Sequence, residues 1–189
     1  MMLKTVLMAL VACGLGIAPA LAEVSAGIEA SNNCYDQFRT GNMEKAVEFC
    51  TTAITSGELD KDELVGALIN RGVAFRALGK YKRAISDYSA ALNHAPNDAM
   101  IYANRANARR DLGELKNAYD DANKAIALDG ERAASFYTRG AVLEAAGQLR
   151  NARKDYMQAL KLAPDNMAFQ NSILQLDEKL AQNGAGRQP

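Results

Sequence analysis

The feature that most constrains this chain is a segment that recurs at a fixed period. Residues 78–88, 112–122 and 146–156 share one pattern, and each segment has a glycine at its second position. Gly79, Gly113 and Gly147 are therefore 34 residues apart. A period of about 20 to 50 residues indicates structural units that stack along an axis. The sequence therefore predicts an array of repeats.

Small residues recur in phase on both sides of these glycines. Two helices joined by a tight turn approach closely only where side chains are small, and a glycine at the turn can end the first helix in the left-handed conformation. A proline stops the second helix, and because one hairpin cannot bury its apolar face alone, the hairpins stack. The in-phase residues are Gly72, Ala106 and Gly140; Ala84, Ala118 and Ala152; Ala91, Ala125 and Ala159; and Pro96, Gly130 and Pro164.

This pattern resembles the tetratricopeptide repeat family over residues 27–181. The resemblance implies an all-α, right-handed solenoid of about four helical hairpins, whose concave face binds peptides or partner proteins. We expect a capping helix at 165–181 and a disordered tail at 182–189. An insert at about 57–62 lengthens the first link by four residues. The repeats are at about 27–60, where Gly41 marks the turn of a degenerate copy, and at 65–98, 99–132 and 133–166.

The first 22 residues have the features of a cleavable signal peptide. A short positive segment containing Lys4 precedes an apolar stretch that ends near Ile17, and residues 20–22 fit the small-x-small cleavage rule. The apolar stretch is shorter than the roughly 20 residues of a membrane-spanning helix. We therefore predict cleavage after Ala22, a short linker at 23–26, and a periplasmic or secreted protein.

A second interpretation of the N-terminus stays open. Residues 10–13 resemble a lipobox, the motif in which a cysteine, here Cys13, is lipidated and becomes the new N-terminus. In that case the same scaffold is a lipoprotein tethered to a membrane.

The two remaining cysteines belong to the degenerate repeat. The resemblance places Cys34 at the small position of its first helix and Cys50 on its second helix, with the turn at Gly41 about midway between them. Antiparallel helices would bring the two side chains level. We predict a Cys34–Cys50 disulfide formed in an oxidising compartment; a pair of free thiols and a redox pair are the alternatives.

The resemblance also assigns a binding face. A column of carboxamides on the first helices could hydrogen-bond an extended peptide backbone, or be a hydrophilic surface without a ligand. Neighbouring positions add apolar, aromatic and cationic side chains that suit a peptide with apolar anchors and a carboxylate. The column is Asn32, Asn70, Asn104 and Thr138, and the neighbouring positions are Tyr35, Ile69, Val73, Arg76, Met100, Asn107, Arg110 and Tyr137.

One known use of this binding face is not expected here. Co-chaperones of the family bind chaperone C-terminal tails through a set of lysines and asparagines. Val73, Ala134 and Thr138 stand at positions of that set in this chain. We therefore do not expect binding of such tails.

Two charged columns also repeat in phase. Opposite charges at a constant separation most simply pair within or between hairpins, because an arginine fork matches a carboxylate. The first repeat has Asn33 and Phe49 at these positions. The columns are Arg71, Arg105 and Arg139, and Asp87, Asp121 and Asp155.

The sequence contains no recognisable catalytic pattern. The single histidine, His94, ends a predicted second helix, where a cation suits the helix C-terminus. We find no metal-ligand cluster, phosphate-binding loop or nucleophile motif, and expect no cofactor. The net charge of zero does not indicate a nucleic-acid partner. The leading hypothesis is an exported adaptor for proteins or peptides; the alternatives are a self-assembling envelope protein and, less favoured, an enzyme.

Overall fold

The computed structural model describes residues 25–185, with side chains up to residue 182. The predicted signal peptide, Cys13, and residues 186–189 of the predicted tail lie outside the described residues. The described part is entirely helical, and none of its helices is long and apolar enough to cross a membrane. Its nine helices are α1 (Ala26–Arg39), α2 (Met43–Ser56), α3 (Lys61–Ala77), α4 (Tyr81–His94), α5 (Ala99–Leu112), α6 (Leu115–Leu128), α7 (Ala133–Ala145), α8 (Leu149–Leu162) and α9 (Met167–Ala185).

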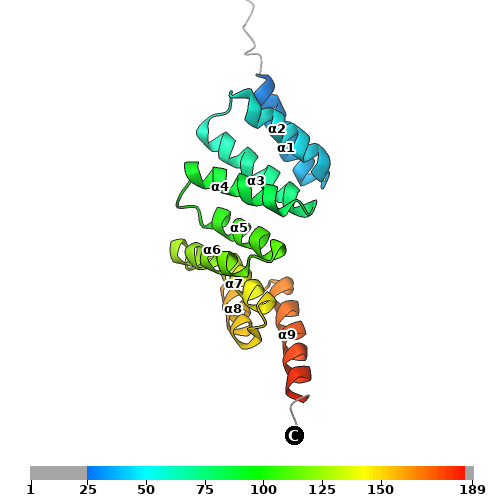
Figure 1. The fold of residues 1–189 in the computed structure, drawn as a ribbon, viewed down its shortest axis with the longest axis vertical. Helices are drawn as coiled ribbons and strands as arrows, with labels where there is room; N and C mark the ends of the chain where they lie inside the picture. Colours follow the sequence, from blue (N-terminus) through cyan, green and yellow to red (C-terminus); the bar gives the residue numbers. More distant parts are fainter. Residues whose placement is uncertain (1–24, 186–189) are drawn as a thin grey trace, which may run out of the picture.

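Consecutive helices form four hairpins, α1–α2, α3–α4, α5–α6 and α7–α8 (Figure 1). Each turn between the two helices of a hairpin contains a glycine with a positive φ angle, between 70° and 89°, a conformation in which other residues are strained. α4 ends two residues before Pro96, and α8 ends two residues before Pro164. The predicted start and stop signals of the helices are thus placed as expected.

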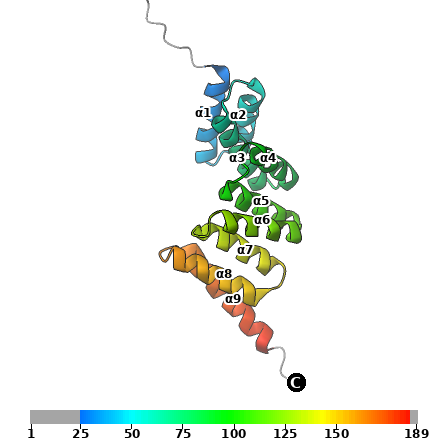
Figure 2. The same cartoon turned by 90° about the vertical axis from the view of Figure 1, so that its left-hand side faces the viewer.

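The hairpins stack into an elongated all-α solenoid, and α9 closes the last one (Figure 2). Within the described residues, α1 contacts α3, α3 contacts α5 and α5 contacts α7, whereas α2, α4, α6 and α8 do not contact one another to a comparable extent. The stack therefore curves with the first helix of each hairpin on its inner side. The inner face, as used below, is the side of these first helices that points away from the second helices.

The two helices of each hairpin contact each other at an equivalent position, but the pair of residues that makes this contact differs between repeats. Gly72 packs against the ring of Tyr88, and Gly140 against that of Tyr156, so closely that a Cβ atom on either glycine would lie within 2.7 Å of the ring. At the equivalent position of the first repeat, Cys34 and Cys50 are fully buried and joined by a disulfide. The predicted disulfide is confirmed, and it replaces a glycine–tyrosine contact.

The predicted charge columns pair within hairpins. Arg71 binds both carboxylate oxygens of Asp87 at 2.8 Å, and Arg105 does the same to Asp121. The remaining guanidinium nitrogen reaches back to the preceding repeat, where Arg71 donates to Thr51 and Arg105 to Ser89. Each arginine thus fixes its own hairpin and its junction with the preceding repeat.

Two predicted boundaries need correction. The insert at 57–62 was expected to lengthen the link before α3, but only part of it does so. Asp60 and Glu63 form a capping box at the start of α3, and the helix begins at Lys61. The rest of the insert therefore adds a turn to the N-terminus of α3. The C-terminal helix was expected to end at 181, but α9 continues to Ala185. No proline or positive-φ glycine interrupts it before that point, so residues 182–185, which were predicted to belong to the tail, are helical.

Candidate functional site

The inner face carries carboxamides that are free to bind a ligand. Asn32 is exposed on α1, and Asn70 and Asn104 are partly exposed at the same position of α3 and α5. Among the hydrogen bonds of residues 25–185, none uses the side chains of these three asparagines. Each carboxamide offers two donors and an acceptor, which is what an extended peptide backbone needs.

Apolar side chains lie beside the carboxamides. Tyr35 is 56% exposed on α1, unusually high for a large aromatic side chain, and Val73 is partly exposed one repeat further along. An exposed aromatic ring can anchor an apolar group of a ligand. The N-terminal half of the inner face therefore combines free amides with accessible apolar surface.

The two predicted groove arginines already share a carboxylate. Arg76 Nε lies 2.6 Å from Asp111 Oδ2, and the guanidinium of Arg110 contacts Asp111 Oδ1 at 2.8 and 3.1 Å. Both arginines remain partly exposed, at 35% and 21% of their side-chain surface. The cluster keeps one excess positive charge, but its first role is to join α3 to α5.

Two further predicted groove residues are used for packing between repeats. Thr138 is 3% exposed, and its hydroxyl oxygen accepts a 3.2 Å hydrogen bond from the Asn107 carboxamide. The prediction that Thr138 completes the free carboxamide column is therefore wrong, because α5 and α7 pack closely enough to bury it. Asn107 keeps part of its hydrogen-bonding capacity.

Tyr137 is likewise engaged by the capping helix. Its ring stacks on Phe169 at a centroid distance of 4.8 Å and lies 5.2 Å from the ring of Tyr156. Its hydroxyl lies 3.1 Å from Ser172 Oγ on α9. Tyr137 is therefore a support for α9 rather than a free anchor, and the accessible binding face is shifted toward α1, α3 and α5.

A partly exposed charge cluster links α7, α8 and α9. Glu144 accepts hydrogen bonds from Lys179 Nζ at 2.5 Å and from the Tyr156 hydroxyl at 2.7 Å. Burial acts to raise the pKa of Glu144, but these two hydrogen bonds outweigh it and leave the pKa below its ordinary value. Burial and the bond to Glu144 raise the pKa of Tyr156, so its hydroxyl stays a donor. Neither group titrates near neutral pH, which does not favour general acid–base chemistry.

The sequence analysis did not identify the residues that bind the predicted groove side chains, although a regular sequence separation between them was present. The contacts Arg76–Asp111, Tyr137–Ser172 and Glu144–Lys179 are each separated by 35 residues, one repeat plus one position. A search for complementary side chains at this separation would have identified Asp111 and Lys179. The same search would have shown that Arg76 is engaged.

A hollow at the links between hairpins includes one predicted groove residue, Met100, in its lining. It has a volume of 640 Å³ and lies where Lys61 and Arg132 alternate with Asp98 and Asp129. Asp98 is already the N-cap of α5. The hollow is open and mixes both charges without a directed set of donors, so we place the binding site on the inner face.

The described residues contain no group of three or more His, Cys, Asp or Glu side chains that could hold a metal ion. His94 is exposed at the C-terminus of α4, as expected from the sequence. The charged clusters found above are paired with partners in the fold. What this arrangement offers chemically is therefore hydrogen bonding and apolar contact.

Comparison with known proteins identifies the repeats. Three family models described as tetratricopeptide repeat match residues 65–98, 99–132 and 133–166, which together are more than half of the chain. The chain belongs to the tetratricopeptide repeat family. Proteins of this family are generally non-enzymatic scaffolds for protein interaction. No curated protein matches the chain.

Solved structures share the fold. The first tetratricopeptide domain of human RPAP3 is 30% identical, with a TM-score of 0.61, and the match covers 65% of this chain and 96% of that domain. A structure of the first such domain of Spaghetti (RPAP3) bound to the HSP90 peptide SRMEEVD is also 30% identical, with a TM-score of 0.58 over 65% and 97% of the two chains. MamA from Desulfovibrio magneticus RS-1 is 18% identical, with a TM-score of 0.68 over 85% and 89%, which shows the shared fold alone.

Proposed function

We propose that this protein is an exported, non-enzymatic adaptor that binds an extended segment of a partner protein on the inner face of α1, α3 and α5. The observation that carries the proposal is the set of free carboxamides on Asn32, Asn70 and Asn104, placed one repeat apart. Such groups recognise a peptide backbone independently of its sequence. A similar domain, that of Spaghetti, is bound to a peptide, which supports the same use of the fold here.

The accessible side chains indicate which part of the partner matters. Tyr35 and Val73 provide apolar contact beside the amides, and the Arg76–Asp111–Arg110 cluster supplies one excess positive charge. A segment with an apolar residue followed by a carboxylate therefore fits this face best. Because each hydrogen bond contributes only about 1 kcal/mol net, the affinity must come from several of them together.

Export of the protein has two independent supports. The N-terminal segment has the charge and apolar pattern of a signal peptide. The fully buried Cys34–Cys50 disulfide is the kind of bond that persists in oxidising compartments. Mass spectrometry of the protein from fractionated cells tests this. A periplasmic species beginning at residue 23 is expected. Lipidated Cys13 would mean export with a membrane anchor, whereas an uncleaved cytoplasmic species would contradict export.

Site-specific crosslinking in cells tests the binding face. A photoreactive amino acid at Val73 should capture a partner, and the same group at the exposed Ser86 on α4 should not. Asn70→Ala with Asn104→Ala should reduce the capture at Val73 at least tenfold, since two ligand hydrogen bonds are lost.

The matched control for these substitutions is Asn93→Ala with Asn117→Ala, two exposed asparagines on the second helices of the same repeats. Capture should be unchanged in this variant. Equal capture from Val73 and Ser86, or equal loss in both double variants, would place binding away from the inner face.

A further inference from the structure

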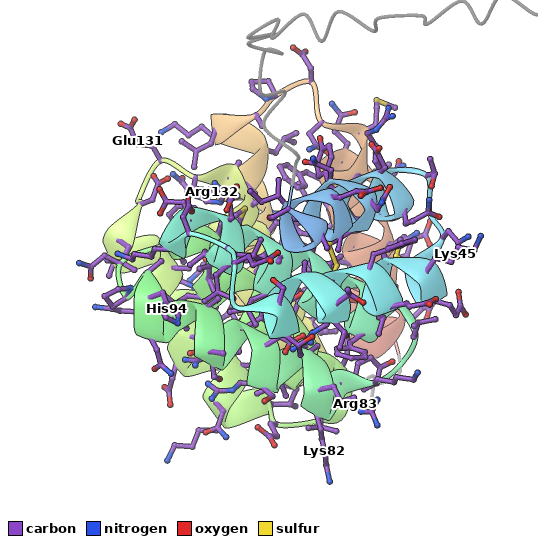
Figure 3. All side chains as sticks on the ribbon, turned by 90° about the horizontal axis from the view of Figure 1, so that it is seen from above. Lys45, Lys82, Arg83, His94, Glu131 and Arg132 are labelled. Carbon is purple, nitrogen blue, oxygen red and sulfur yellow. A yellow bond between two sulfur atoms is a disulfide. The ribbon has the colours of Figure 1, made fainter. Side chains whose placement is uncertain are left out.

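The two long edges of the solenoid carry opposite charge. The turns within the second to fourth hairpins, at 78–84, 112–118 and 146–152, hold five basic residues and one acid, Glu114. The links between hairpins, at 57–63, 95–98, 129–132 and 163–166, hold eight acids and two basic residues. Figure 3, a view along the stack, shows Lys45, Lys82 and Arg83 on the side opposite His94, Glu131 and Arg132. The basic residues of the turn edge are Lys80, Lys82, Arg83, Lys116 and Arg150.

The turn-edge cations are available for an external partner. All five side chains are exposed, and among the described residues none of them forms an ion pair. Lys82, Lys116 and Arg150 occupy the same position of successive repeats, so they form a row along the edge. None of these residues belongs to the inner face, and this surface is therefore independent of the proposed peptide site.

These positions oppose the preference of the helices that carry them. The row lies in the first turns of α4, α6 and α8, which contain no acidic residue and have no side-chain cap. The N-terminus of a helix is the positive end of its dipole, so a cation there is unfavourable. The first turn of α3, on the opposite edge, follows the rule with Asp60, Asp62 and Glu63. Because the same unfavourable placement of a cation occurs in three successive repeats without a compensating contact, it indicates a role other than stabilising the fold.

The turn edge also has apolar surface among its charges. A hollow of 350 Å³ beside α4 is lined by Gly79, Tyr81 and Leu112 together with Lys80, Lys82 and Arg83. Tyrosine beside lysine and arginine is typical of surfaces at the boundary between water and a membrane, because each side chain has an apolar part and a polar end.

We propose that the turn edge of α4, α6 and α8 binds the surface of an anionic lipid bilayer. The cations are long, exposed and hydrogen-bonded to nothing in the described residues. Apart from Arg83, which lies over the ring of Phe75, they supply charge without fixed geometry. This suits a continuous sheet of negative headgroups better than a peptide with a defined register. With this edge on the membrane, the acidic links face away from it, and the inner face stays open at the side.

Sedimentation with lipid vesicles tests the proposal. The wild-type protein should sediment with phosphatidylcholine vesicles that contain phosphatidylglycerol, should not sediment with phosphatidylcholine alone, and should be released by salt. Lys82→Glu, Lys116→Glu and Arg150→Glu together should weaken binding more than about a hundredfold, since each basic residue near such a surface contributes about fivefold. The same variant should be at least as thermally stable as the wild type, because each new acid lies at a helix N-terminus.

The matched control reverses three exposed lysines elsewhere, Lys61→Glu, Lys124→Glu and Lys161→Glu, and should bind as the wild type does. The proposal is wrong if the wild type fails to bind anionic vesicles, or if both triple variants lose binding equally. It is also wrong if light scattering without vesicles shows salt-dependent self-association that only the turn-edge variant loses. In that case the edge binds the acidic links of a second copy.

Discussion

Arg139 on α7 binds both carboxylate oxygens of Asp155 on α8 at 2.7 Å, and its third nitrogen donates to Asn123 of the preceding repeat at 2.9 Å. The Asp155 side chain is only 9% exposed. The hydrogen bond to this carboxylate raises the pKa of Arg139, so its guanidinium stays charged at any physiological pH. One side chain thus sets the spacing within a hairpin and the register between two hairpins.

Arg139→Gln should lower the free energy of unfolding by about 3 kcal/mol, because it leaves the buried carboxylate of Asp155 without its cation. Chemical denaturation measures this, with Arg150→Gln as the control, since Arg150 is exposed and should change stability by less than about 0.5 kcal/mol. Adding Asp155→Leu to an Arg139→Met variant should recover much of the loss. If Arg139→Met is equally unstable with and without Asp155→Leu, packing rather than the ion pair stabilises this junction.

The column of Arg–Asp ion pairs, called the ladder below, stops at both ends of the array. In the first repeat, Asn33 and Phe49 stand where the later repeats have arginine and aspartate. In the last repeat, Met157 takes the place of the acceptors Thr51, Ser89 and Asn123, and Ile173 on α9 takes the place of the arginine. A further hairpin could not extend the ladder in either direction. The three junctions that it fixes are therefore those of the four hairpins described here.

The first repeat, which lacks the ion pair, should depend on its disulfide. Cys34→Ala with Cys50→Ala should lower the free energy of unfolding by about 3 kcal/mol, the value expected for a closed loop of 16 residues. Hydrogen exchange should show the loss in α1 and α2, while α5 to α8 remain protected. The two alanines resemble the Ala106–Ala122 pair of the third repeat, so the variant should still form helices.

Reductant supplies the control for this change. Wild-type protein unfolded under reducing conditions should match the variant, and the variant should be insensitive to reductant. If the reduced wild type is as stable as the oxidised protein, apolar packing alone maintains the first repeat, and the disulfide has no stabilising role.

Much of this fold could be predicted from the sequence, because a 34-residue period repeats the same small residues at every close contact. The period and the family resemblance place a small residue, Gly72, at a helix contact, and they repeat Arg71 and Asp87 in phase. That Gly72 packs against Tyr88 is seen only in the structure. The start of α3 could not be predicted in the same way. Four inserted residues could form a loop or an extra turn, and the capping box of Asp60 and Glu63 decided between them.

The candidate site was less predictable, because its accessibility depends on contacts between repeats. The register places Asn70 and Thr138 at equivalent positions, yet one is partly exposed and the other is buried. The difference comes from Asn107, which donates to Thr138, and from how closely α5 and α7 pack. The engagement of Tyr137 depends in turn on Phe169 in a helix that has no complete repeat of its own.

The Glu144 cluster should make the attachment of α9 depend on acid. Because the folded-state pKa of Glu144 lies below its ordinary value, it stabilises the fold above the unfolded pKa of about 4.3, and this contribution is lost as the pH falls through the lower folded value. Glu144→Gln should lower the free energy of unfolding by about 1 kcal/mol at neutral pH. The difference from wild type should shrink as the pH falls below about 4.

Urea unfolding at several pH values measures the Glu144 effect. Glu178→Gln removes one exposed acid from α9, next to Lys179, and should leave stability at neutral pH close to that of the wild type. A Glu144→Gln deficit that persists unchanged in acid would mean that the lost hydrogen-bond geometry, and not the charge, accounts for the effect.

Two glycines in α3 should respond oppositely to the same substitution. A Cβ atom on Gly72 would lie 2.7 Å from a ring carbon of Tyr88, which is fully buried. Gly72→Ala should therefore lower the free energy of unfolding by about 1–2 kcal/mol, despite the better helix propensity of alanine. Gly66, in the same helix, has no neighbouring atom within 4 Å of its Cβ position, so Gly66→Ala should gain about 0.5–1 kcal/mol. Thermal unfolding of the two variants compares them directly. If Gly72→Ala also stabilises the protein, the ring of Tyr88 can shift, and close approach of the helices is not what requires a glycine at this position.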